Sequence, residues 1–159
     1  MFTNIVWATD GSEQADRALG YAAEIASRDG AALHVVHVIE KVIGGRMAGQ
    51  FNAYLNEEQL DDKIRRQTRE LADEGTVTAT LHLTAGRSAD IARRITEVAT
   101  ETGADLIVIG TRGHAAVVGA LVGSVTQHLL HIAPCPVLAV PPARTAVGSP
   151  SPESAAAAS

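Results

Sequence analysis

The sequence lacks several features that would place it in a specialised class of protein. Cysteine occurs once, at Cys135, so no intrachain disulfide can form, and we expect a reducing, cytoplasmic location. The longest candidate apolar run, residues 115–123, has about half the length that a membrane span needs, so we expect no membrane partner. Residues 1–10 carry no basic segment and no small-residue cleavage site, so we also expect no signal peptide.

Clustered positive charge is missing as well. The formal net charge is -5 at pH 7, and acidic and basic residues interleave along the chain. Arg65, Arg66 and Arg69 form the densest basic group, but glutamate and aspartate flank them on the same expected helix. Counterion release from nucleic acid requires clustered lysine and arginine, so we expect no nucleic acid partner and interpret this helix as a solvated, ion-paired surface.

The 159 residues show an alternation of short β-branched runs and helical patterns, and their number suits a single domain. We expect strands at residues 5–8, 33–38, 76–84, 106–109 and 136–140. We expect helices at residues 13–28, 57–74, 88–102 and 123–131, the third of them beginning with a Ser88 cap. This order predicts an α/β fold in which helices cover both faces of an open parallel sheet.

Two segments lack such a pattern. Residues 40–56 have weak periodicity and scattered glycines, and we expect a long surface loop with one helical turn at most. Residues 143–159 consist mainly of Ala, Ser, Pro and Thr. They cannot bury enough surface to offset their ordering entropy, so we expect a domain over residues 1–142 followed by a disordered tail.

A glycine-rich segment follows the most apolar expected strand and leads into the last helix, at the sheet edge where open α/β folds bind ligands. Gly110, Gly113 and Gly123 lack a Cβ and would let backbone N–H groups approach a phosphate chain closely. Ser124 adds a hydroxyl at a helix N-terminus, where the dipole favours negative charge. Glycines that only permit tight turns are the alternative.

Other polar residues lie within this segment or near it. Arg112 and His114 could supply positive charge, although neither a Walker A motif nor a dinucleotide fingerprint is present. Asp10 follows the first expected strand at the same sheet edge. Its carboxylate is either a helix-capping turn residue or an acceptor for a ribose, and both roles can hold together.

The pattern Gly110-x2-Gly113-x9-Gly123-Ser124 resembles the nucleotide-binding signature of the universal stress protein family, and its spacing matches completely. The resemblance extends over residues 2–141, including the Asp-Gly-Ser turn after the first strand. It implies a Rossmann-like, single-domain, five-stranded parallel sheet of order 3-2-1-4-5, similar to the adenine-nucleotide-binding α/β superfamily (adenine nucleotide alpha hydrolase-like). It also implies membership of the subgroup that binds ATP, with Mg2+ as the accompanying ion.

The resemblance further implies roles for individual residues. Asp10 would accept hydrogen bonds from the ribose, and the backbone of Val38 would meet the adenine edge. Ala8 stands where many members have proline. The full set of implied nucleotide-binding residues is Ala8, Thr9, Asp10, Val38, Ile109, Gly110, Arg112, Gly113, Gly123, Ser124, Val125 and Thr126. A homodimer is implied through the last strand, residues 137–140, which carries no charge to guard its edge.

Histidines near the end of the chain raise a metal site as a competing possibility. His128 and His131 are three residues apart on the last expected helix, and Cys135 follows four residues later. No second ligand cluster supports them, and a histidine pair near a helix C-terminus is more often favoured by the helix dipole. We expect no metal site.

Binding a triphosphate does not imply cleaving it, because hydrolysis also requires a positioned water and an orienting group. Asp10, His114 and Thr126 form no recognisable catalytic pattern. We therefore expect an ATP-binding stress-response or signalling module with little or no hydrolysis. The alternatives are an interaction module whose pocket is empty or holds AMP or cyclic AMP, and a slow ATPase.

Overall fold

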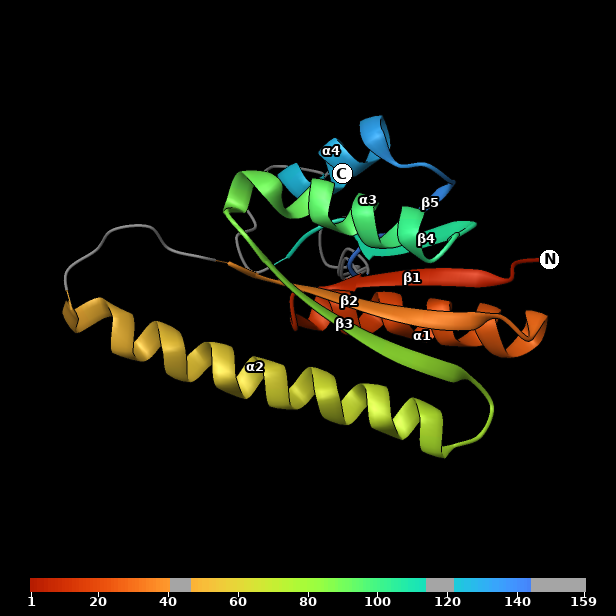
Figure 1. Ribbon diagram of the computed structural model, residues 1–159, viewed down its shortest axis with the longest axis horizontal. Helices are drawn as coiled ribbons and strands as arrows, with labels where there is room; N and C mark the ends of the chain where they lie inside the picture. The colour runs from red at the N-terminus through yellow and green to blue at the C-terminus, as the bar shows by residue number, and fades with distance from the viewer. Residues whose placement is uncertain (41–46, 114–121, 144–159) are drawn as a thin grey trace, which may run out of the picture.

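The computed structural model describes residues 1–40, 47–113 and 122–143, of which 47–56 by backbone only. Five strands form one sheet of order β3-β2-β1-β4-β5 (Figure 1). They are β1 (Asn4–Thr9), β2 (Ala32–Glu40), β3 (Thr78–Gly86), β4 (Leu106–Gly110) and β5 (Val137–Val140). Every pairing is parallel, which confirms the expected sheet and its strand order.

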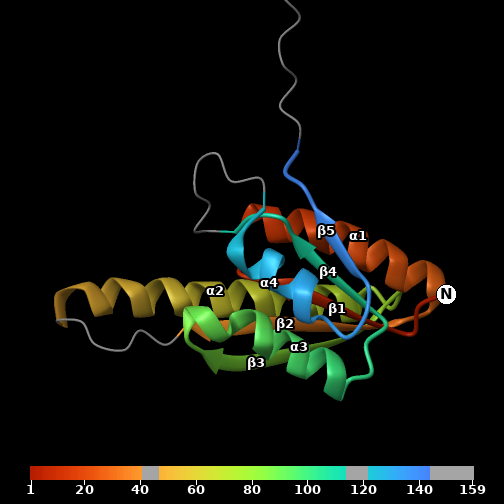
Figure 2. The same ribbon diagram turned by 90° about the horizontal axis from the view of Figure 1, so that it is seen from above.

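Helices cover both faces of the sheet (Figures 1 and 2). On one face lie α1 (Glu13–Asp29) and α2 (Met47–Asp73); on the other lie α3 (Ile91–Glu101) and α4 (Ser124–Ile132). Side chains alternate between the two layers, so that Trp7 packs on the α1 side and Val6 on the α3 side. Every residue of β4 is buried, as expected for a central strand.

Helix α1 packs closely because the side chains on its buried face are small. These are Ala15, Ala18, Ala22 and Ala26. Ser12 is the N-cap, and its Oγ accepts a hydrogen bond from the Ala15 N–H at 3.2 Å. Trp7 Nε1 donates to the Ala15 carbonyl at 3.0 Å, which ties β1 to the first turn of the helix.

The expected loop over residues 40–56 is wrong in part, because α2 begins at Met47 and runs without interruption to Asp73. Its second half packs on the sheet through Ile64, which is fully buried. A helix that is already nucleated extends at little cost even where periodicity is weak. The sequence pattern over residues 47–56 therefore predicted a helix that is too short.

Two other expectations need correction at helix and strand ends. Ser88 does not cap α3: it begins a short 3-10 helix (Ser88–Asp90), and the N-cap of α3 is Asp90, which makes no capping hydrogen bond through its side chain. Strand β3 starts at Thr78, two residues later than expected. The reason is that Thr78 pairs with Ala32, the first residue of β2.

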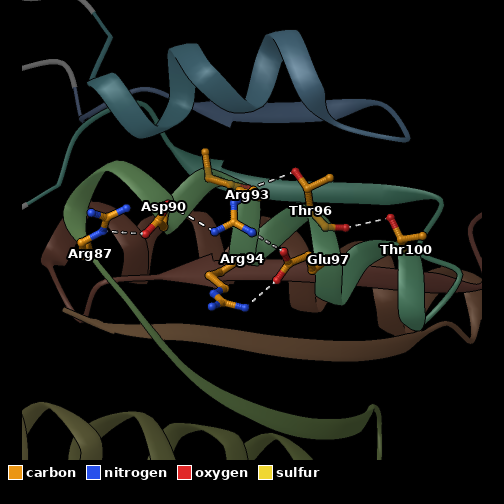
Figure 3. A network of polar contacts seen from close by, with 8 residues as sticks. Arg87, Asp90, Arg93, Arg94, Thr96, Glu97 and Thr100 are labelled. Atoms are coloured by element: carbon orange, nitrogen blue, oxygen red, sulfur yellow. Dashed lines mark hydrogen bonds and ion pairs between the residues drawn. The ribbon is translucent and has the colours of Figure 1, made fainter. Parts of the chain in front are cut away.

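Asp90 instead takes part in an ion-paired network on the surface of α3 (Figure 3). Its carboxylate lies 3.2 Å from Arg87 Nε and 3.2 Å from Arg93 Nη2. Glu97 lies 2.9 Å from both Arg93 and Arg94. Exposed pairs of this kind contribute about 0–1 kcal/mol each to the free energy of folding. The network therefore orders side chains on the surface of α3 but adds little to the stability of the fold.

The expected tail covers residues 143–159, and all of it beyond residue 143 lies outside the described part of the chain, as does His114. No helix within the described residues combines the length and the apolarity that a membrane span requires.

Candidate functional site

The sheet reverses its strand order between β1 and β4, and their carboxyl ends lie side by side because Ala8 pairs with Ile109. Open α/β sheets bind ligands at such a switch point. Ala8 and Ile109 are both buried and belong to the core layer that faces α3 and α4. Two loops extend from this point: the β1–α1 turn and the segment after β4.

The β1–α1 turn is held by its own side chains. Thr9 Oγ1 accepts from the Gly11 N–H at 3.0 Å, and Asp10 Oδ1 accepts from the Ser12 N–H at 3.0 Å. Gly11 has a φ of 76°, in the left-handed region that glycine tolerates. Asp10 is therefore a turn residue, while the cap of α1 itself is Ser12.

The segment after β4 is tied to its surroundings at both ends. The Thr111 N–H donates to the Val140 carbonyl at 2.8 Å, and the Gly123 N–H donates to the Thr111 carbonyl at 2.6 Å. Thr126 Oγ1 donates to the Gly110 carbonyl at 2.9 Å. These bonds hold the start of α4 against the end of β4, on either side of residues 114–121.

Close packing explains two of the three signature glycines. A Cβ on Gly110 would lie 3.1 Å from the Gln14 carbonyl oxygen of α1, and a Cβ on Gly123 would lie 3.3 Å from the Thr111 carbonyl oxygen. Both neighbours are backbone atoms, which cannot move aside without shifting an element. Close packing therefore accounts for Gly110 and Gly123 without any ligand, and neither residue has the positive φ that a glycine turn requires.

Gly113 is different, because its neighbour is a side chain and not backbone. A Cβ on Gly113 would overlap with the Asp10 carboxylate, at Oδ2. Gly113 and Asp10 are far apart in the sequence and meet above the switch point. The fold thus brings the expected ribose acceptor against the middle glycine of the signature.

The remaining expected site residues lie around this contact at different depths. Val38 is buried near the end of β2 and packs toward α3. Arg112 is half-buried, and its Nε has no hydrogen-bond partner among the described residues. Ser124 is exposed at the start of α4, whereas Val125 packs against the α3-side core.

A cavity of about 350 Å³ separates the N-terminal ends of α3 and α4. It is lined by Ser88, Ala89, Ala92, Ser124, Val125 and His128. A second cavity of about 400 Å³ lies near Gly30 and Thr78, at the amino ends of β2 and β3, and no ionisable residue lines it. Only the first of these two lies next to the glycine-rich segment.

Three residues at the site escaped sequence reasoning. Thr111 is only 9% exposed, and its Oγ1 has no hydrogen-bond partner within the described residues. His37 is buried and donates from Nδ1 to the Thr9 carbonyl at 3.0 Å. Lys63 of α2 donates to the Gly11 carbonyl at 2.7 Å. Thr111 could have been suspected from its place between two signature glycines, but nothing in the sequence points from α2 to the turn.

The histidines near the end of the chain do not gather into a metal centre. Within the described ranges, no three or more His, Cys, Asp or Glu side chains lie close enough together to hold an ion. His128 lines the cavity beside α4, and His131 is exposed. Burial raises the pKa of the half-buried Cys135 thiol, and the nearby Asp105 raises it further.

Comparison with known proteins places this geometry in a family. The chain is 37% identical over 144 residues to a universal stress protein of Thermus aquaticus, covering 88% of this chain and 99% of the relative. The structure of universal stress protein UspA from Lactobacillus plantarum matches with a TM-score of 0.69 at 26% identity, covering 87% of this chain and 97% of that one. A universal stress protein from Archaeoglobus fulgidus in complex with dAMP matches with a TM-score of 0.55 at 26% identity, covering 88% and 98%.

The family profile settles the assignment. It matches residues 1–141, the same stretch that contains the sheet, its four helices and both loops of the candidate site. On that match and the 37% identity above, the chain belongs to the universal stress protein family.

Proposed function

We propose that the protein binds ATP at the switch point between β1 and β4 and acts as a stress-response or signalling module with little or no hydrolysis. The contact between Asp10 and Gly113 carries the proposal. It brings a carboxylate that can accept from ribose hydroxyls next to a loop whose glycine backbone can approach phosphates closely. A relative of 26% identity was solved with dAMP, which supports an adenine nucleotide as the ligand.

In this proposal each group of residues meets one part of the nucleotide. Asp10 accepts from the ribose, and the Val38 backbone faces the adenine edge. The loop from Gly110 to Gly113 and the start of α4 at Gly123 and Ser124 take the phosphates, where the helix dipole favours negative charge. Ala8, Thr9, Ile109, Val125 and Thr126 support these positions from the strand ends and the first turn of α4.

Charge balance favours a divalent cation with the nucleotide. The Asp10 carboxylate lies against the same loop that would receive the phosphates, and like charges at short range repel. Mg2+ prefers oxygen ligands and is commonly bound through substrate phosphates and one or two carboxylates. The proposal therefore includes Mg2+ as the ion that accompanies the triphosphate.

The proposal extends to assembly and location. Strand β5 is an edge of the sheet and carries four uncharged residues, Val137–Val140. An uncharged edge invites pairing, so we propose a homodimer through this strand. The single cysteine fits a reducing compartment, and we propose the cytoplasm.

Isothermal calorimetry of the purified protein with ATP, ADP, AMP and cyclic AMP, each in Mg2+, tests the proposal. The expected result is saturable binding of ATP that is tighter than that of AMP, with no phosphate release above the buffer rate. AMP or cyclic AMP binding as tightly as ATP would favour the adenylate module instead. Phosphate release that is lost in Asp10→Ala would establish a slow ATPase, and absence of binding by all four nucleotides would refute the proposal.

A further inference from the structure

Helix α2 lies directly over the β1–α1 turn, although the two are far apart in sequence. The Leu60 side chain fills the space beside Gly11 so closely that a Cβ on Gly11 would overlap with it. One turn further on, Ile64 is fully buried in the core layer that faces α1. The middle of α2 is therefore fixed against the turn that carries Asp10.

Lys63 makes the polar part of this contact. Its Nζ donates to the Gly11 carbonyl at 2.7 Å and to Asp16 Oδ2 at 2.6 Å. Gln67 Nε2 donates to the other carboxylate oxygen, Asp16 Oδ1, at 2.9 Å. The Lys63 and Asp16 side chains are 33% and 31% exposed, so solvent screens their attraction less than that of a fully exposed pair.

The Gly11 carbonyl matters because of what lies at the other end of its peptide group. The carbonyl of Gly11 and the N–H of Ser12 belong to one planar unit. Lys63 holds the oxygen of this unit, and Asp10 Oδ1 accepts from its N–H at 3.0 Å. A rotation of the peptide would break both bonds and remove one of the contacts that orient the Asp10 carboxylate.

Nothing in the backbone of Gly11 itself prevents such a rotation. Its φ of 76° is one of several conformations that glycine adopts at low cost, because it has no Cβ. The orientation of the peptide must therefore come from contacts around it. Within the described residues, Lys63 donates a hydrogen bond to its oxygen. Asp16 holds the Lys63 ammonium group in place, and Gln67 holds the Asp16 carboxylate.

We propose that Lys63 is a positioning residue that sets the Asp10 carboxylate for recognition of ribose hydroxyls, which makes α2 part of the ribonucleotide selectivity of the site. The inference rests on the proposed nucleotide binding. It assigns the ligand class as nucleotides with free ribose hydroxyls. Lys63 acts through the Gly11–Ser12 peptide and not by touching the nucleotide.

A pair of ligands separates this role from general support of the fold. Calorimetry measures the Kd of ATP and of 2′,3′-dideoxy-ATP, which lacks both hydroxyls that Asp10 could bind. For the wild-type protein we expect dideoxy-ATP to bind about tenfold or more weakly, since a hydrogen bond to a carboxylate is lost. Lys63→Met is expected to reduce this ratio to about threefold or less, mainly by weakening ATP, because the carboxylate loses its orientation.

Matched variants control the experiment. Arg66→Met removes a cationic side chain from an exposed position of the same helix and is expected to leave both Kd values unchanged. Gln67→Leu keeps Lys63 but frees one oxygen of Asp16, and we expect an intermediate ratio. This variant also provides the test if thermal melting shows that Lys63→Met does not fold.

The outcomes distinguish the inference from the proposed function. In one outcome the wild type prefers ATP over dideoxy-ATP, but the Lys63 and Gln67 variants keep the full ratio of the two Kd values or bind both ligands equally more weakly. This outcome would overturn only the role of Lys63. Equal binding of the two ligands by the wild type would remove ribose recognition, and the inference with it, while nucleotide binding stands. Binding of neither ligand would overturn the proposed function itself.

Discussion

Glycine serves two different purposes at the candidate site. At Gly110 and Gly123 the missing Cβ makes room for backbone atoms of neighbouring elements, whereas at Gly113 it makes room for the Asp10 carboxylate. The spacing of the three glycines was visible in the sequence, but this difference was not. It depends on α1 and the β1–α1 turn, which reach the loop only through the fold.

The difference predicts that the same substitution acts on ligand affinity at one position and on stability at the other. Gly113→Ala is expected to lower ATP affinity at least tenfold, because the added methyl group displaces Asp10 from its place. Gly110→Ala is expected to cost about 1–3 kcal/mol of folding free energy, because its methyl group meets backbone atoms of α1. Calorimetry with ATP measures the first effect, and urea unfolding measures the second.

Gly20 offers a matched control on α1. A Cβ at this exposed position meets nothing within 4 Å, and the residue lies in the interior of a helix. Gly20→Ala should leave ATP affinity unchanged and raise the free energy of unfolding by about 0.5–1 kcal/mol. Loss of ATP affinity in Gly20→Ala equal to that in Gly113→Ala would contradict the special role of position 113.

At the scale of elements, the sequence predicted best where burial is periodic. The strands β1, β2, β4 and β5 and the buried faces of α1 and α3 follow from runs and stripes of apolar residues, because each must cover a core layer. The first turns of α2 and the cap of α3 were missed. Neither shows a regular apolar stripe in the sequence, so local pattern does not predict its form.

The pairing of β2 with β3 brings two histidines together. His34 Nδ1 lies 3.1 Å from His82 Nε2, and His34 Nε2 lies 3.4 Å from Asn4 Oδ1. Burial lowers the pKa of His34, and the charge of His82 lowers it further. The sequence could not pair His34 with a residue of β3, because the register between the strands was unknown.

This pKa shift predicts how stability depends on pH. The unfolded chain binds a proton at His34 near pH 6.5, whereas the folded chain binds it only at lower pH. The free energy of unfolding should therefore fall as pH drops through about 6.5, and the loss should level off below the pKa of the folded state. Above about pH 7.5 this group should have no effect.

Urea unfolding between pH 7.5 and 5 measures this dependence. His34→Gln should have a shallower decline than the wild type over that range, because the group responsible is gone. His131→Gln, at an exposed position of α4, should retain the wild-type decline. Parallel curves for wild type and His34→Gln would show that the pair does not control acid sensitivity.

For the whole molecule, the sheet order and the meeting of Asp10 with the glycine-rich segment follow from the topology that the family resemblance implied. The involvement of α2 did not follow, because a helix connected by residues 41–46 can pack on a parallel sheet at many registers. Lys63 reaches Gly11 only at the register that also buries Ile64. Contacts between elements distant in sequence are thus the part of the site that pattern reasoning leaves open.

The proposed dimer through β5 is also a property of the whole molecule. With a chain mass of 16.5 kDa, sedimentation equilibrium at micromolar concentration should give twice that mass. Ala139→Asp on β5 should shift the protein to monomer, because a charge at the pairing edge opposes strand addition. Ala79→Asp, an equally half-buried position on the opposite edge strand β3, should leave the mass unchanged.

The contact between Asp10 and Gly113 is tested most directly by a crystal structure of the protein grown with ATP and Mg2+. The account predicts that the ribose hydroxyls bind the Asp10 carboxylate and that the phosphates lie along the backbone of Gly113, Gly123 and Ser124. A structure at saturating ATP in which the nucleotide is absent from this switch point, or is bound elsewhere with Asp10 untouched, would contradict it.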